Sequence, residues 1–415
     1  MRNDYFLAID LKSFYAAVEC IDRGLDMFSS PLVVCDETRG EGTIVLAVSP
    51  CLRALGVPSR LRKFELPRLP NIIFAKPRMG RYLEVSAMFN SLLLNYVGED
   101  DLHIYSVDEC FLNVGPYLKM YNMSADELAE VILQDIKRTL GLVATAGIGP
   151  NMFLAKVAMD IDAKHQANNI AHWTYDDVPT KLWPITPLSK LWGIAKGYER
   201  KLNNLGLLSI GDIATYPKVR LKELFGVMGE ELWEHANGID DTDIRDKYIP
   251  TSTSISQGQT LFRNYNKSEA KLLLREMNDD LARRLRAREQ VATGVSVQIV
   301  YADRTLKSDT VQVNLTRPSK HNNELYEALV TLYEQKAKNL PIRGVHISYF
   351  GLQEDNYYQI DFFNDVDEQI IELNLYATLD HIQAKYGLNA VMRSTALIGH
   401  SNSIKRHNEI GGHAR

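Results

Sequence analysis

The sequence predicts an α+β protein with several domains. Its 415 residues are more than one hydrophobic core ordinarily organises. Apolar runs typical of strands alternate with amphipathic stretches through about residue 168, short helices with glycine turns follow, and a third region again combines strands with helices. A hydrophobic content of 45% and a charged content of 24% are typical of a globular protein that folds in water.

The first predicted element is a strand, "YFLAID", a continuous apolar run that suits burial on both faces. It ends in Asp10, and "KSFYAAVECIDR" then has helical character, with Ser13 as a plausible N-cap. A strand that ends in an acid and leads into a helix N-terminus is suited to binding phosphate and metal together.

The next elements complete the same domain. Residues Leu102 to Val114 predict a hairpin, "LHIYS" against "CFLNV", and "ADELAEVILQDIKRTLG" predicts an amphipathic helix that ends at Gly141. "LVATAGIG" predicts a buried strand and "NMFLAKVAMDIDAKH" another helix. We therefore expect one sheet domain through about residue 168, interrupted by a segment near residues 12–78.

The remainder divides into a helical region, a second sheet domain and a tail. Short helices are predicted between 169 and 242, and the polar "RDKYIPTSTSISQGQT" indicates a linker. Alternation in "VSVQIV", "VQVNL" and "VHISY", with helical stretches at 267–289 and 322–338, predicts a small sheet with two helices on one face. No ordered element is predicted in the last residues, which are acidic around 361–372.

Several classes of protein are excluded by composition. No apolar run is long enough to span a membrane, and the N-terminus lacks the pattern of a signal peptide. The four cysteines have no metal-binding spacing, which predicts a reduced, cytoplasmic protein without structural zinc. The net charge of −5 gives no global indication of nucleic-acid binding, although local patches decide that question.

The acids Asp108 and Glu109 are adjacent among apolar residues of the predicted hairpin. Taken alone, they could be two solvated acids in a surface turn. Asp10, however, ends a separate buried strand, and three neighbouring carboxylates would each raise the pKa of the others. Hard oxygen ligands of this kind suit Mg²⁺, and two such ions catalyse phosphoryl or nucleotidyl transfer.

Five motifs in order resemble one family, the Y-family (translesion) DNA polymerases, over residues 4–355. They are "AIDLKSFYAAVE", "PRMGRYLEVS", "YSVDECFLNV", "GIGPNMFLAKVAMD" and "KLWGIAKGYERKLNNLGLLSIGDIA". "AVSPCLRALGVP" and the long tail resemble the UmuC-like branch of Gram-positive bacteria and their mobile elements. "GIGPNM" itself lacks the residues of a dinucleotide-binding or Walker loop.

The resemblance implies a right-hand polymerase that copies damaged templates with low fidelity during DNA repair and the SOS response. Its parts would be a ferredoxin-like palm (1–11 and 79–168), small fingers (12–78), a helix-hairpin-helix thumb (169–242) and an α/β little finger (243–355) that grips DNA. A nucleotide cyclase would not need the thumb or the DNA-gripping domain. A catalytically inactive relative would not need the three acids.

The resemblance also implies a set of site residues. Asp10, Asp108 and Glu109, with the main-chain carbonyl of Leu11, would bind two Mg²⁺ ions, with Mn²⁺ as an alternative. Tyr15 would exclude the 2′-hydroxyl of a ribonucleotide, and the triphosphate of the dNTP would contact the backbone of residues 13–15. The nucleotide-binding set is Ser13, Phe14, Tyr15, Arg53 and Lys164, with Lys156 as the competing candidate for the lysine.

The tail of residues 356–415 contains "QIDFF", which resembles the motif that binds the bacterial sliding clamp. A glutamine, a spacer and large apolar side chains can insert into a hydrophobic pocket as an extended peptide. The alternative is a final strand or helix packed on the core. The expected partners are primer–template DNA, dNTP and a sliding clamp, with the protein itself a monomer. The clamp-binding residues would be Gln359, Ile360, Asp361, Phe362 and Phe363.

Overall fold

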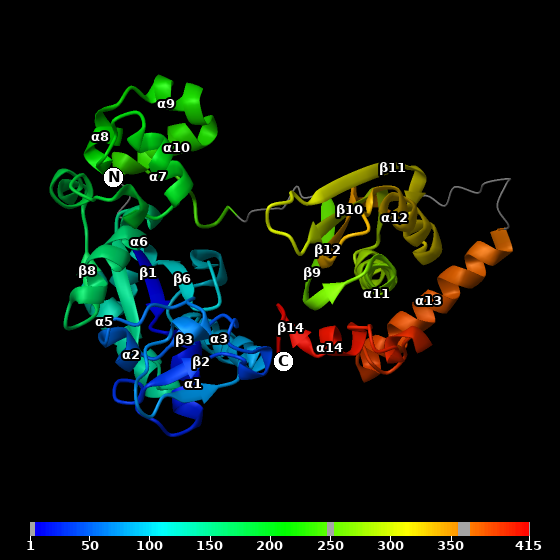
Figure 1. Cartoon of the computed structure of the whole chain (residues 1–415). Helices are drawn as coiled ribbons and strands as arrows, with labels where there is room; N and C mark the ends of the chain where they lie inside the picture. The colour runs from blue at the N-terminus through cyan, green and yellow to red at the C-terminus, as the bar shows by residue number, and fades with distance from the viewer. Residues whose placement is uncertain (1–4, 247–252, 356–365, 415) are drawn as a thin grey trace. The chain divides into compact units, whose positions relative to one another are not determined.

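The computed structural model describes residues 5–246, 253–355 and 366–414. The chain forms two compact units that divide between Tyr248 and Ile249 (Figure 1). Each unit contains its own sheet, which confirms the prediction of a multidomain α+β protein. No helix within the described ranges is long and apolar enough to cross a membrane.

The first unit is built on a five-stranded sheet with the order β5-β6-β1-β7-β8. The central strand β1 pairs antiparallel with both β6 and β7, as the predicted strands and hairpin require. The edge strand β8 pairs parallel with β7, so the sheet extends past residue 169, where we expected the helical region to begin. That strand is too short to be predicted from its pattern. The strands are β1 (Phe6–Leu11), β5 (Leu102–Ile104), β6 (Glu109–Asn113), β7 (Ala144–Gly149) and β8 (Ile170–His172).

The two faces of β1 contact different helices, because side chains alternate along a strand. Leu7, Ile9 and Leu11 are buried in one core with α1 (Phe14–Asp22), α3 (Met79–Leu93) and α5 (Ala125–Leu140). Phe6 and Ala8 pack on the other side, with Phe111 and with Ala155 of α6 (Met152–Ile161). Asp10 has the same parity as Phe6 and Ala8, so it faces α6.

Two glycines allow α6 to lie close against β7. A Cβ atom on Gly147 would be 2.0 Å from the carbonyl oxygen of Ala155, and one on Gly149 would be 2.5 Å from the amide nitrogen of the same residue. No side chain fits at such distances. The glycines of "GIGPNM" therefore serve helix–strand packing, and they set the distance between α6 and the sheet.

A small sheet with the order β3-β2-β4 interrupts this domain, as the sequence predicted for residues near 12–78. It has a separate core that includes Val33, Val45 and Leu52. The strands are β2 (Leu32–Val34), β3 (Ala47–Val48) and β4 (Ile73–Ala75), and the short helix α2 (Pro50–Ala54) follows β3.

The helical region of the first unit packs around its own core, which includes Trp173, Leu202 and Leu221 and also Phe153 of α6. Gly193 and Gly206 adopt positive φ angles of 87° and 81°, which other residues rarely adopt. Both glycines lie in the hairpin-like segments that the sequence predicted. The helices are α7 (Lys196–Asn203), α8 (Ile210–Thr215), α9 (Lys218–Phe225) and α10 (Val227–Ala236).

The second unit contains a sheet with the order β11-β10-β12-β9 and two helices packed on one of its faces. The alternating positions Val295, Val297 and Ile299 are buried against these helices, which confirms the predicted arrangement. The elements are β9 (Ser254–Tyr265), α11 (Lys267–Arg286), β10 (Gln290–Tyr301), β11 (Asp309–Ser319), α12 (Asn322–Lys336), β12 (Ile342–Phe350) and β13 (Gln353–Glu354).

Residues 366–414 form ordered elements that contact α11, so the expectation of no order there is wrong for this range. They are α13 (Val366–Tyr386), α14 (Ser403–His407), β14 (Glu409–Ile410) and β15 (His413–Ala414). Arg286 makes two hydrogen bonds with Asp380, of 2.8 and 2.9 Å, and Arg406 contacts Asp280 at 2.8 Å. These ion pairs form between residues far apart in the sequence, which a local pattern cannot reveal.

Candidate active site

Asp10 and Glu109 are direct cross-strand partners at one end of the sheet. Their side chains therefore lie on the same face, the one that faces α6. Asp108 immediately precedes β6, and its carbonyl oxygen accepts a 2.9 Å hydrogen bond from the amide of Leu11. The fold thus brings together the three acids that the sequence singled out, although they come from segments about a hundred residues apart.

Each of the three acids contacts a different partner. The Nζ atom of Lys164 lies 3.4 Å from Oδ2 of Asp10, and the Nζ atom of Lys156 lies 2.6 Å from Oε1 of Glu109. The Ser106 hydroxyl donates a 2.7 Å hydrogen bond to Asp108. These contacts offset the repulsion that like charges opposite each other on a sheet would cause.

Asp160 on α6 joins the two lysines. One of its oxygens lies 3.1 Å from Lys156 Nζ and the other lies 2.7 Å from Lys164 Nζ. Its position one helical turn after Lys156 explains the first contact. The sequence analysis missed Asp160, and the i,i+4 spacing between these residues is the signal that could have indicated it.

The surroundings raise the pKa values of Asp10 and Glu109. Burial, opposed by Lys164 and reinforced by the charge of Asp108, raises the pKa of Asp10. Burial also raises the pKa of Glu109, although its contact with Lys156 opposes the shift. The carboxylates are thus less acidic than they would be in water, and an added cation would favour their ionised form.

Helix α1 begins directly beside the acids. Ser13 occupies the N-cap position with a positive φ of 50°, and its side chain makes no capping hydrogen bond, so the predicted capping role is wrong. Phe14 is buried in the core, whereas Tyr15 is only half-buried. Burial and then the charge of Asp108 raise the pKa of Tyr15, so this ring lies near the acids.

Tyr15 stacks on Tyr82, with 4.5 Å between the ring centroids and 21° between the ring planes. Tyr82 is fully buried, and its hydroxyl donates a 2.7 Å hydrogen bond to the buried carboxylate of Glu19. Arg78 also contacts Glu19, at 2.9 Å. Tyr82 belongs to "PRMGRYLEVS", but the sequence pattern alone indicated no role for this residue.

The sequence matches the impB/mucB/samB family at residues 9–160, the C-terminal domain of that family at 252–362 and the IMS family HHH motif at 175–207. It is 34% identical to UvrX of Bacillus subtilis over 98% of this chain and 97% of that protein. It is 30% identical to DNA polymerase IV 2 of the same species over 100% of this chain and 99% of that protein. The chain belongs to the Y-family of DNA polymerases.

A solved structure confirms the fold of this Y-family member. A Y-family DNA polymerase chimera of Dbh and Dpo4 matches 84% of this chain and 99% of its own length, with a TM-score of 0.67 and 20% sequence identity. The polymerase therefore has the expected α+β multidomain fold, with a helix-hairpin-helix motif and a C-terminal little finger domain.

The acids of the polymerase fit a divalent cation by their chemistry. The carboxylates of Glu109, which is buried, and Asp10, which is partly buried, have raised pKa values, and a cation would offset the cost of their burial. In the described ranges, no three His, Cys, Asp or Glu side chains are grouped as metal ligands. Asp10 and Glu109 each contact a lysine. The ammonium groups of these lysines thus supply positive charge beside the two acids.

The remaining predicted residues lie apart from the acids or outside the described part of the chain. Arg53 is exposed on α2, and its guanidinium donates a 3.0 Å hydrogen bond to Ser59. The segment Gln359–Phe363 lies outside the described residues.

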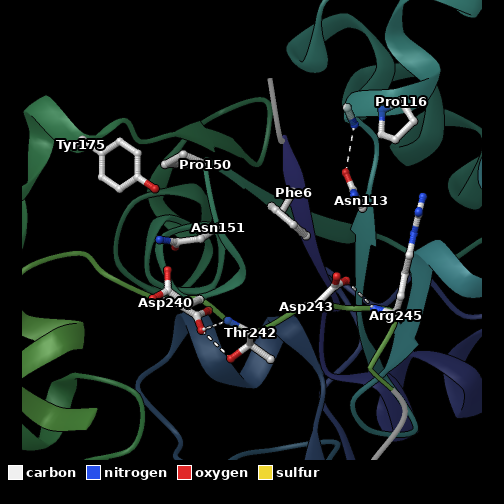
Figure 2. Close-up of a pocket in the computed structure, with 12 residues that line it drawn as sticks. Phe6, Asn113, Pro116, Pro150, Asn151, Tyr175, Asp240, Thr242, Asp243 and Arg245 are labelled. Atoms are coloured by element: carbon white, nitrogen blue, oxygen red, sulfur yellow. Dashed lines mark hydrogen bonds between the residues drawn. The ribbon is translucent and has the colours of Figure 1, made fainter. Parts of the chain in front are cut away.

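A cavity of about 590 Å³ in the first unit is separate from this site (Figure 2). It opens at the end of β1 that carries Phe6, opposite the end with Asp10. Asp240 at its edge accepts a 3.0 Å hydrogen bond from the first turn of α6, and Arg245 pairs with the buried Asp101 at 2.9 Å. These contacts attach the segment that follows α10 to α6 and to Asp101 beside the sheet. We therefore assign a structural role to the residues that line this cavity.

Proposed function

We propose that this Y-family polymerase extends a primer 3′-hydroxyl with dNTPs by a two-metal-ion mechanism centred on Asp10, Asp108 and Glu109. The observation that carries the proposal is the cross-strand pair of Asp10 and Glu109, with Asp108 beside it and lysines facing it. Such a set of buried and partly buried acids is better stabilised by Mg²⁺ than without a cation.

The acids and the carbonyl of Leu11 would hold two Mg²⁺ ions, with Mn²⁺ as an alternative. When bound, these ions activate the primer hydroxyl and stabilise charge on the leaving pyrophosphate. The protein contributes the fixed positions of the acids, which the β1–β6 register determines. Ser106 orients Asp108 through its hydrogen bond.

The start of α1 and two basic residues would bind the triphosphate. Amide groups of residues 13–15 lie at a helix N-terminus, which attracts anions, and the Ser13 side chain does not occupy them. Arg53 would contact the nucleotide from the fingers. Lys164 is the better of the two lysine candidates, because 39% of its side chain is exposed, compared with 8% for Lys156.

Two lysine substitutions should separate these roles. Lys164→Met is expected to raise the KM for dNTP about tenfold with little change in Tm, because an exposed phosphate contact is lost. Lys156→Met should instead lower Tm, since removing one partner of a buried pair costs about 3–5 kcal/mol. Steady-state kinetics and thermal melts of both variants measure this. If Lys156→Met instead raised the KM without changing Tm, and Lys164→Met left the KM unchanged, Lys156 would be the residue that contacts the triphosphate.

The rest of the chain would hold DNA. The palm (1–11 and 79–168) and fingers (12–78) would enclose the new base pair, while amides of the thumb hairpin (169–242) contact phosphates without reading sequence. In the little finger (243–355), strand β9 would lie along the duplex backbone. Such a polymerase acts in translesion synthesis during DNA repair, and we propose that it works as a cytoplasmic monomer in the SOS response.

The segment "QIDFF" would bind the bacterial sliding clamp as an extended peptide. Replacing both Phe362 and Phe363 with Ala is expected to weaken binding of purified clamp at least about tenfold, because two buried aromatic anchors are removed. Primer extension without the clamp should not change. Surface plasmon resonance measures the affinity, and equal affinities of the double variant and the wild type would exclude the motif.

Primer extension with Mg²⁺ tests the proposal as a whole. Purified protein, a primed template and four dNTPs should give products extended by template-directed addition, and a template with a damaged base should also be copied. No extension of either template would refute the proposal, whereas products that ignore the template sequence would refute template direction.

A further inference from the structure

The turn that carries Asp108 contacts the thumb through one aromatic residue. Tyr105 lies between β5 and β6, with 46% of its surface exposed, and its ring packs edge-on against Phe111 at 5.8 Å. Its amide donates a 3.0 Å hydrogen bond to the carbonyl of Glu109. The position of Tyr105 is therefore tied directly to the backbone of Glu109, a predicted metal ligand.

Trp192 from the helix-hairpin-helix region contacts Tyr105. The indole Nε1–H donates a 3.1 Å hydrogen bond to the Tyr105 hydroxyl, and the rings meet at 70° with 6.1 Å between their centroids. Trp192 falls inside residues 175–207, which match the HHH motif. Both residues belong to the first compact unit. A directional bond between two half-exposed or exposed groups fixes an orientation that apolar packing alone would leave free.

The same tryptophan is connected to α6 by a second pair of rings. Its centroid lies 6.0 Å from that of His235, and His235 stacks on Phe153 at 4.2 Å with 9° between the planes. Burial lowers the pKa of His235. Phe153 is on the helix that carries Lys156 and Asp160. Trp192 thus contacts both the turn with Asp108 and, through His235, the helix with Lys156.

We propose that Trp192 is a positioning residue that acts through Tyr105 on the turn with Asp108. By holding this turn relative to α6, it sets the distance between the acids of the hairpin and Lys156 of the helix. The inference rests on the proposed role of Asp108. It predicts that the thumb contributes to the chemical step as well as to the binding of DNA.

A double-mutant cycle tests this role. Tyr105→Phe and Trp192→Phe each keep an aromatic ring at the position but remove the hydrogen bond, so each should lower kcat for dNTP addition about fivefold. Because both remove the same interaction, the double variant should also lose about fivefold rather than the product of the two. The KM for dNTP and the Kd for primer–template DNA should each change by less than about twofold, since ground-state binding is not affected.

Matched substitutions elsewhere in the unit provide controls. Trp183→Phe removes an indole hydrogen bond to the carbonyl of Ala236, and Tyr96→Phe removes a hydroxyl bond to Asp135. Neither bond lies beside the acids, so kcat should be unchanged in both variants even if Tm falls. A similar loss of kcat in the controls, or losses that multiply in the double variant, would overturn the proposal. A loss confined to DNA affinity would overturn it as well.

The parent proposal is tested independently by Asp108→Asn. If that variant keeps full activity, the site assignment fails whatever the cycle shows. If that variant is inactive but the Tyr105 and Trp192 variants match the wild type in kcat, only the positioning role is refuted.

Discussion

Asp108→Asn should reduce primer extension roughly a thousandfold or more, because a lost metal ligand removes several kcal/mol of transition-state stabilisation. Asparagine keeps the size of the side chain and can still accept the hydrogen bond from Ser106. The substitution therefore removes the charge with little change in shape. Affinity for primer–template DNA should stay within about threefold, since that surface is elsewhere.

Thermal stability provides a second measurement for the same variant. Saturating Mg²⁺ with a dideoxy-terminated primer, template and the correct dNTP should raise Tm of the wild type, because these ligands bind the folded state. The increase should be much smaller for Asp108→Asn. Asp126→Asn removes an exposed acid on α5 that pairs with His172, and it should behave like the wild type. Full extension by Asp108→Asn would contradict the assignment.

Tyr15→Ala should lower discrimination against ribonucleotides about a hundredfold, because the ring that would collide with a 2′-hydroxyl is removed. The measured quantity is the ratio of kcat/KM for a dNTP to that for the matching ribonucleotide. Tyr15→Phe keeps the ring and its stack on Tyr82, so it should retain most of the discrimination. Unchanged discrimination in Tyr15→Ala would refute the role.

The stack beneath Tyr15 extends this prediction to Tyr82. Tyr82→Leu removes the ring on which Tyr15 rests, so we expect a partial loss of discrimination without a change in the acids. Tyr82→Phe keeps the stack and loses only the bond to Glu19. It should therefore discriminate better than Tyr82→Leu. Equal ratios in Tyr82→Leu and the wild type would show that Tyr15 is held by other contacts.

The sequence predicted the elements of this protein where local pattern and burial agree. The strand "YFLAID", the hairpin at 102–114 and the helix that ends at Gly141 are each indicated by apolar runs or by helical periodicity. The three acids were recognised because adjacent carboxylates among apolar residues need an explanation. Five ordered motifs identified the family, and the comparisons confirm it.

The sequence pattern alone could not give the partners of these residues. Lys156 and Lys164 both follow the same strand. Only the tertiary structure shows that Lys156 is buried against Glu109, whereas Lys164, beyond the end of α6, is partly exposed. The stack of Tyr15 on Tyr82 and the bond from Trp192 to Tyr105 join residues more than sixty positions apart. The order of residues 366–414 likewise depends on ion pairs with α11.

The sequence by itself therefore determined the family, the secondary structure of the main domains and the three acids. These features depend on residue type and on short-range spacing, which a single chain displays directly. The tertiary structure decided which face Asp10 occupies, which lysines contact Asp10 and Glu109, and how Trp192 reaches the hairpin. Those features depend on register and on helix packing, since a shift of one residue in β1 would turn Asp10 away from α6.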